Sequence, residues 1–265
     1  MSRSVRLTWQ SGVVALGTRF GPAHHRAARH ALTVVGALAV PYIIVINQAR
    51  SVLGFDAYAY WAIDLADLYG RSFQNTSGFG AFRYTPAIGQ AFSVFGALPW
   101  EVFFVGWFVA MVATLFWMTG RNAVLLVAFP PLALELYHGN VHLFMAAAIV
   151  LGFRWPATWA FVVLTKVTPG IGLVWFAVRR EWAKLAVALG ATVVVSVVSY
   201  AVAPGLWREW LDALLVNAGQ SQGFSVPPPL AIRLPVAAAL VAWGAATDRP
   251  WTVGVAAMLA LPILW

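Results

Sequence analysis

The sequence predicts an all-α integral membrane protein, a polytopic bundle of about eight or nine membrane helices with interfacial helices in its external loops. Hydrophobic residues make up 61% of the 265 residues, charged residues make up only 10%, and the mean hydropathy is +0.78. A soluble domain of average composition carries about 25% charged residues. Apolar runs also follow one another with short polar breaks, so the chain has no room for a large soluble domain.

The N-terminal part of the chain is strongly basic. The formal net charge is +8, and residues 1–30 hold arginines at positions 3, 6, 19, 26 and 29 without one acidic residue. Such a flank is typical of a cytoplasmic segment, and this interpretation is favoured over nucleic-acid binding. We therefore expect a cytoplasmic segment over 1–30 and a single transmembrane domain over 31–265. Its first run, at 31–46, should be an uncleaved anchor, since the charged region is too long for a signal peptide.

Residues 47–85 form the first expected external loop, and they contain three aspartates. On a helix with about 100° per residue, these aspartates share one side, and apolar residues share the other. The helix is expected to lie in the membrane interface with its apolar side down. The polar side consists of Asp56, Tyr60, Asp64 and Asp67, and the apolar side consists of Phe55, Ala59, Ala62, Ala66 and Tyr69.

Asp56 has two interpretations. It can belong to the wet face of the interfacial helix, like Asp64 and Asp67. Alternatively, partial desolvation beside hydrocarbon raises the pKa of its carboxyl toward the range of a general base. Only a specific feature of Asp56 separates the two.

The remaining apolar runs should be membrane helices, but several are shorter than the roughly 20 residues of a perpendicular span. Such runs either borrow flanking residues or are half-helices packed inside the protein. The basic cluster at 179–184 is expected in the cytoplasm, and residues 204–230 should form a second external loop with an interfacial helix. The runs lie at about 86–98, 101–118, 123–137, 140–153, 157–177, 184–203, 231–247 and 251–265.

A lysine stands near the middle of one apolar run. A cation at the centre of a membrane helix costs about 2.5–3.5 kcal/mol, so Lys166 is expected to face a cavity or an anion. Pro169 should kink this helix near the lysine. The alternatives are that Lys166 snorkels to the interface or forms an ion pair with Glu135.

A polar group, Tyr-His-Gly-Asn-Val-His, separates two further apolar runs at 137–142. His138, Asn140 and His142 can surround a phosphate or sugar hydroxyls, although the same residues also suit an ordinary corner between two helices. The spacing of the two histidines would permit a metal ion, but no suitable carboxylate apart from Glu135 is near, and no metal or other cofactor is expected. Cysteine chemistry is excluded because the chain has no cysteine.

Two arginines lie at expected membrane boundaries. Arg83 and Tyr84 stand where the first external loop re-enters the membrane, and Arg233 stands where the second loop does so. Such arginines are either anchors to lipid headgroups or contacts for an anionic substrate.

The order of these motifs is more specific than any one of them. It runs from Phe-Asp at 55–56, through Arg-Tyr-x-Pro at 83–86, Gly-Asn-x-His at 139–142 and Lys-x-x-Pro at 166–169, to a polar loop that ends at Arg233. This order resembles glycosyltransferase family 87 of the GT-C superfamily, which contains the polyprenyl-phosphate-mannose-dependent mannosyltransferases. The chain resembles a short member, in which Asn140 and His142 stand where the family has Gln and Asn.

The resemblance implies an inverting enzyme of the bacterial plasma membrane. It would transfer mannose or a pentose from a polyprenyl-phosphate donor to a lipid or glycan acceptor on the extracytoplasmic face. Asp56 falls on the family's catalytic aspartate, and the remaining candidates would bind the donor phosphate or sugar. These candidates are Lys166, Arg83, Tyr84, Asn140, His142, His138 and Arg233. The alternatives are a transporter or flippase for a lipid-linked anion, with Lys166 binding the cargo, and an inactive membrane scaffold.

Overall fold

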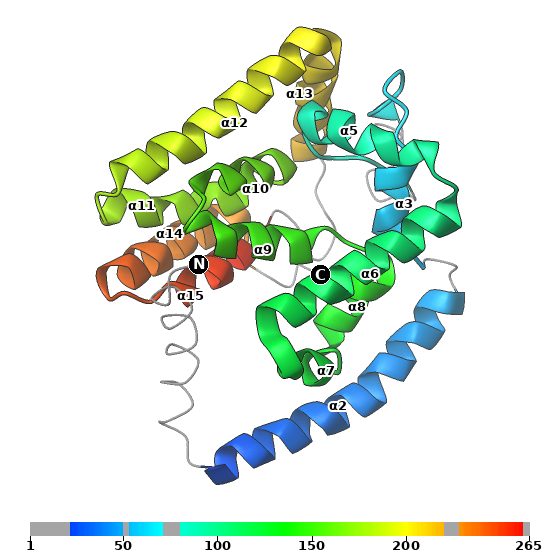
Figure 1. The fold of residues 1–265 in the computed structure, drawn as a ribbon, viewed down its shortest axis with the longest axis vertical. Coiled ribbons are helices and arrows are strands. Elements are labelled where there is room, and N and C mark those ends of the chain that lie inside the picture. The colour runs from blue at the N-terminus through cyan, green and yellow to red at the C-terminus, as the bar shows by residue number, and fades with distance from the viewer. Residues whose placement is uncertain (1–21, 50–52, 71–79, 220–227, 262–265) are drawn as a thin grey trace.

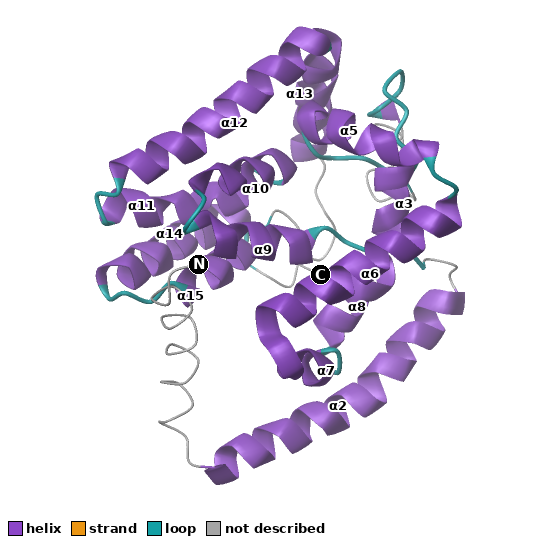
Figure 2. Ribbon diagram, viewed as in Figure 1, coloured by secondary structure: helices purple, strands orange, loops and turns teal. Residues whose placement is uncertain are grey.

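The structure, a computed structural model, describes residues 22–49, 53–70, 80–219 and 228–261. Within these ranges every regular element is a helix, and no strand occurs (Figure 2). This confirms the predicted all-α class. The basic residues 1–21 and much of the polar loop after position 219 lie outside the described residues.

Short helices form the centre of the molecule, and two long helices lie at opposite edges of it (Figure 1). In the centre, α14 packs on α15 and α11, while α10 packs on α9 and on the long helix α12. The buried rings of Trp159 and Phe176 lie in this core. The central helices are α9 (His142–Gly152), α10 (Trp159–Thr165), α11 (Val174–Val178), α14 (Leu230–Ala246) and α15 (Trp251–Leu259), and the long helices at the edges are α2 (Pro22–Ala49) and α12 (Trp182–Val202).

A second group of helices includes the described start of the segment that the sequence predicts to be external. The helix α3 packs on α6, α5 and α8, and α6 also packs on α9. Aromatic rings fill this region, with Trp107 in contact with Tyr60, Phe92 and Phe144. The group consists of α3 (Phe55–Trp61), α5 (Pro86–Phe92), α6 (Trp100–Thr119), α7 (Ala123–Leu126) and α8 (Pro130–His138).

The expected count of eight or nine spans is not confirmed. By length and composition, two continuous helical stretches among the described residues are able to cross a membrane, Trp100–Leu126 and Trp182–Val202. A third candidate is the pair α8 and α9, which is bent by 107° between His138 and His142. Shorter apolar helices account for further predicted runs. The two long edge helices, α2 and α12, expose apolar side chains along their length, as a lipid-facing helix does.

Two helix breaks lie close to candidate residues, one between the predicted runs 123–137 and 140–153 and one inside the predicted run 157–177. The α8 helix ends at Gly139, whose φ of 69° is the left-handed conformation that terminates helices. The α10 helix ends at Lys166, where the backbone becomes extended, and a 3-10 helix with Pro169 in its first turn follows over Thr168–Leu173. A proline has no N–H to continue the helical ladder, which explains the break.

The predicted interfacial helix over residues 56–69 is shorter than expected. The helix α3 ends at Trp61, and the residues that follow form turns in which Asp64 and Asp67 are exposed. Tyr60 was expected on the wet side, but its side chain is buried. The prediction assumed one continuous helix, whereas Asp64 caps a local turn by accepting a hydrogen bond from the backbone N–H of Ala66 at 2.9 Å. Asp56 thus has surroundings different from those of the other two aspartates.

The second expected external segment begins with a helix. Its bounds are Pro204–Gly219, labelled α13. The basic cluster lies at the turn between α11 and α12, where Arg179 bridges to Asp248 at 2.8 Å and Lys184 bridges to Glu181 at 2.6 Å. The cytoplasmic position of this turn stays a prediction.

Candidate active site

Asp56 lies in the first turn of α3, against the end of α8. The backbone N–H of Gly54 donates to the carbonyl of Tyr137 at 3.0 Å, which fixes the start of α3 beside the break between α8 and α9. Gly139, at that break, approaches Ala57 so closely that a Cβ on the glycine would lie 2.7 Å from the Cβ of Ala57. This close approach brings the carboxylate of Asp56 to the polar residues at 138–142.

The partner of Asp56 is Asn140, a buried side chain. Its Nδ2 donates to Oδ2 of Asp56 at 2.7 Å, while its Oδ1 accepts from the backbone N–H of Val141 at 2.7 Å. The second bond orients the amide so that its N–H₂ group faces the carboxylate. Burial raises the pKa of Asp56 above its ordinary value, although the hydrogen bond from Asn140 and the nearby His138 and Lys166 oppose this rise.

Lys166 reaches the other side of the same turn. Its Nζ lies 2.6 Å from Nε2 of His142, and Nδ1 of His142 lies 3.0 Å from Oε2 of Glu135. The alternative of a direct ion pair between Lys166 and Glu135 is not found, because the imidazole of His142 lies between the two side chains.

The two ionisable groups singled out from the sequence thus meet at one turn. Asn140 donates a hydrogen bond to Asp56, and His142 contacts Lys166. Only Val141 separates Asn140 from His142 in the chain. The charges of Asp56 and Lys166 act on each other. The turn between α8 and α9 is therefore a shared support for a carboxylate and an amine.

The loop before α5 completes this group. Thr85 donates through its backbone N–H and its hydroxyl to the carbonyl of Leu164, at 3.3 and 2.8 Å, and so ties the loop to the end of α10 beside Lys166. The hydroxyl of Tyr84 lies 2.8 Å from that of Tyr60, and Nζ of Lys166 lies 5.9 Å from the centre of the Tyr84 ring. Arg83 in the same loop acts on Asp56 through its charge.

The remaining candidates lie at different distances from this group. His138 ends α8, has its ring 6.1 Å from that of Phe55, and also acts electrostatically on Asp56. Arg233 lies elsewhere, at the start of α14. It is buried, and it donates to the backbone carbonyls of Pro228, Leu259 and Leu261 at 2.6–2.8 Å, which joins α14 to the end of α15.

Two residues of the site were not singled out as such from the sequence. Glu135 was considered only as an ion-pair or metal partner, but both of its carboxylate oxygens contact His142. Trp107 is not among the candidates from the sequence, but its indole N–H donates to the carbonyl of Gly139 at 2.8 Å and holds the turn in place. An acidic residue inside an apolar run was the available signal for Glu135. Across the described part of the chain, no group of three metal-ligating side chains occurs.

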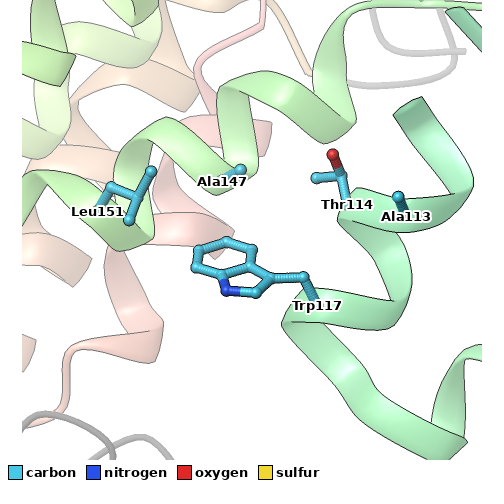
Figure 3. A pocket seen from close by; sticks show the side chains of 5 residues that line it. All are labelled: Ala113, Thr114, Trp117, Ala147 and Leu151. Carbon is cyan, nitrogen blue, oxygen red and sulfur yellow. The ribbon is translucent and has the colours of Figure 1, made fainter. Parts of the chain in front are cut away.

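A groove between α6 and α9 is separate from this group of residues. Its lining is almost entirely apolar, and none of the candidate site residues belongs to it (Figure 3). The lining residues are Ala113, Thr114, Trp117, Ala147 and Leu151. The groove therefore offers no charged group for chemistry.

The turn at Gly139 leads to a prediction on stability. Gly139→Ala places a Cβ against Ala57 at a left-handed φ, so the variant should lose more than about 1 kcal/mol of stability. Thermal unfolding of the detergent-purified protein measures this loss. The matched control is Gly190→Ala in α12, where an added Cβ meets no atom within 4 Å. Its unfolding midpoint should be unchanged or higher, and equal midpoints for the two variants would contradict the packing described for Gly139.

The fold and this group of residues define an all-α protein with membrane-capable helices and a partly buried carboxylate–amine site at two helix breaks. The sequence matches the model of Glycosyltransferase family 87 over residues 82–265, which is more than half of the chain. The chain therefore belongs to glycosyltransferase family 87 and is a glycosyltransferase. The matched part includes Arg83, Asn140 and Lys166, whereas Asp56 precedes it. No curated protein and no solved structure gave a significant match.

Proposed function

We propose that this glycosyltransferase moves a sugar, mannose or a pentose, from a polyprenyl-phosphate donor to a hydroxyl of a lipid or glycan acceptor, with inversion, at the extracytoplasmic face of the plasma membrane. The observation that carries the proposal is the meeting of Asp56 and Lys166 at the turn between α8 and α9. A transfer from a lipid phosphate needs both groups, a base for the acceptor and a cation for the departing phosphate.

Asp56 acts as the general base. The acceptor oxygen attacks the anomeric carbon, and its proton passes to the carboxylate of Asp56 as the new C–O bond forms. The bond between the anomeric carbon and the phosphate oxygen breaks, and its electron pair leaves with the polyprenyl phosphate. Partial burial suits this role, because it raises the pKa of the carboxyl and so makes the carboxylate a stronger base.

Lys166 stabilises the departing phosphate, which gains one negative charge as the bond breaks. A cation fixed in place before the reaction is more effective than water that must reorient. Arg83 adds a second positive charge, and the loop that carries it is tied to the end of α10 beside Lys166. Tyr84, Asn140 and His138 lie in the same region and would bind the donor's phosphate or sugar hydroxyls, while His142 would act through its contact with Lys166.

The direct test of the proposed function is donor consumption. The purified protein is reconstituted in liposomes with polyprenyl-phosphate mannose or a polyprenyl-phosphate pentose and a lipid acceptor, and released polyprenyl phosphate and glycosylated acceptor are measured. The proposal expects both products in equal amounts. A flippase would move the donor across the bilayer without consuming it, and that result would overturn the proposal.

The pH dependence of transfer follows from the surroundings of Asp56. The base works only when deprotonated, so transfer should fall as the pH drops through its raised pKa. Asn140→Ala removes a hydrogen bond that lowers this pKa, so the acidic limb of the pH–rate profile should move to higher pH. Profiles of kcat/KM for the wild type and the variant measure the shift. A movement of the acidic limb to lower pH would contradict the role of Asn140.

A further inference from the structure

The carboxylate of Glu135 has no part in the transfer described above, yet both of its oxygens contact the same residue, His142. Its Oε1 accepts the backbone N–H of His142 at 2.8 Å, and its Oε2 lies 3.0 Å from Nδ1 of the same histidine. The side chains of Glu135 and His142 are only 15% and 20% exposed. Glu135 therefore holds both the backbone and the ring of His142 in a largely buried place.

The protonation of His142 follows from its two neighbours. The Nε2 atom lies 2.6 Å from Nζ of Lys166, so one proton must lie between these two nitrogens. In one case an ammonium of Lys166 donates to a neutral imidazole, and in the other an imidazolium donates to a neutral amine. An ionised carboxylate only accepts, so in both cases Nδ1 of His142 carries a hydrogen and donates it to Glu135.

The opposite tautomer would disrupt the contact with Lys166. With its hydrogen on Nε2, a neutral imidazole would direct an N–H at the ammonium of Lys166, and the amine would turn away. Glu135 excludes this form because its carboxylate accepts the hydrogen on Nδ1. At metal and catalytic sites, a carboxylate that accepts the N–H of a histidine's second ring nitrogen fixes the tautomer in the same way.

We propose that Glu135 is a positioning residue, which locks His142 with its hydrogen on Nδ1 so that Nε2 holds the amine of Lys166 toward the donor phosphate. The last step rests on the proposed function. The other charged groups that act on Lys166 are Asp56 from α3 and Arg83 from the loop before α5. Glu135, His142 and Lys166 form a hydrogen-bonded relay. Together they carry one negative and one positive charge, so the relay is close to neutral before the donor binds.

The first test reads the tautomer and needs no activity. The chain has five histidines, and ¹⁵N NMR of protein labelled at histidine, compared with the spectrum of His142→Asn, isolates the His142 signals. We expect a protonated Nδ1 in the wild type. In Glu135→Gln the amide N–H₂ faces Nδ1, and the hydrogen should move to Nε2. A wild-type Nδ1 without a hydrogen, or an unchanged Nδ1–H in the variant, would overturn the proposal.

The second test reads the consequence for the donor. Glu135→Gln should raise the KM for the polyprenyl-phosphate donor by about tenfold or more, with a smaller effect on the KM for the acceptor, because Lys166 loses its orientation. The matched control is Glu101→Gln at the exposed start of α6, which should change neither constant. Equal donor KM values for the wild type and Glu135→Gln would overturn the positioning role.

The two tests separate this inference from the proposed function. If the wild type consumes no donor, the proposed function fails, while the spectrum of the wild type still decides the tautomer of His142. If Glu135→Gln does not fold, the wild-type spectrum again decides the point, because an Nδ1 without a hydrogen contradicts the relay by itself.

Discussion

Asp56→Asn is expected to reduce sugar transfer by about 10²–10⁴-fold while leaving the protein folded. The substitution keeps the size of the side chain, and its amide oxygen can still accept the hydrogen bond from Nδ2 of Asn140. It removes the capacity to take up the acceptor's proton. The rate of glycosylated acceptor formation in liposomes, with thermal unfolding as the check on folding, measures the effect.

The matched control for this variant lies eight positions further along the chain. Asp64 is exposed in the turns that follow α3, so Asp64→Asn removes the same charge without touching the site. It should retain transfer close to that of the wild type. Normal transfer by a folded Asp56→Asn protein would show that another group is the base.

Lys166→Met is expected to lower kcat/KM for the donor by about 10²–10³-fold. Methionine keeps the length and the apolar stem of the side chain but has no charge, so the departing phosphate loses a cation. The contact at 2.6 Å with His142 is also lost. Lys166→Arg should recover only part of the activity, because the larger planar group does not fit the single position occupied by Nζ.

The other lysine of the chain serves as the control for the charge. Lys184 lies in the first turn of α12, pairs with Glu181 just before that helix, and has a side chain that is 42% exposed. Lys184→Met should cost about 1 kcal/mol or less of stability and leave the donor KM unchanged. An equal loss of transfer in both lysine variants would indicate a general effect of net charge rather than a role for Lys166 at the site.

Composition and apolar runs were sufficient to predict the helical class, because both reflect the cost of placing polar groups in a bilayer. The breaks in the helices were harder to place. The run around Lys166 was predicted as a kinked helix, whereas the structure ends the helix at Lys166 and satisfies the carbonyl of Leu164 through Thr85. That partner lies 79 positions away in the chain, so local sequence gives no sign of it.

The site shows the same division. Only the family resemblance distinguished Asp56 from Asp64 and Asp67, whereas Lys166 stands out because a charge inside an apolar run needs a compensating partner. Glu135 carries the same kind of signal, but its partner His142 is seven positions away and across a turn of 107°. A sharp turn brings the two together where a straight helix would separate them. Arg233 was expected from its position to anchor lipid headgroups or to contact an anionic substrate, and the structure shows it buried and donating to backbone carbonyls.

The proposed mechanism requires Asp56 and Lys166 to lie on either side of the reacting bond, as base and as cation. The most direct test is a structure, by electron cryomicroscopy, of the protein bound to a non-hydrolysable phosphonate analogue of polyprenyl-phosphate mannose. The account predicts a phosphonate within hydrogen-bonding distance of Nζ of Lys166 and an anomeric carbon that faces the carboxylate of Asp56. A phosphonate bound away from Lys166, or a sugar whose anomeric carbon lies out of reach of Asp56, would contradict it.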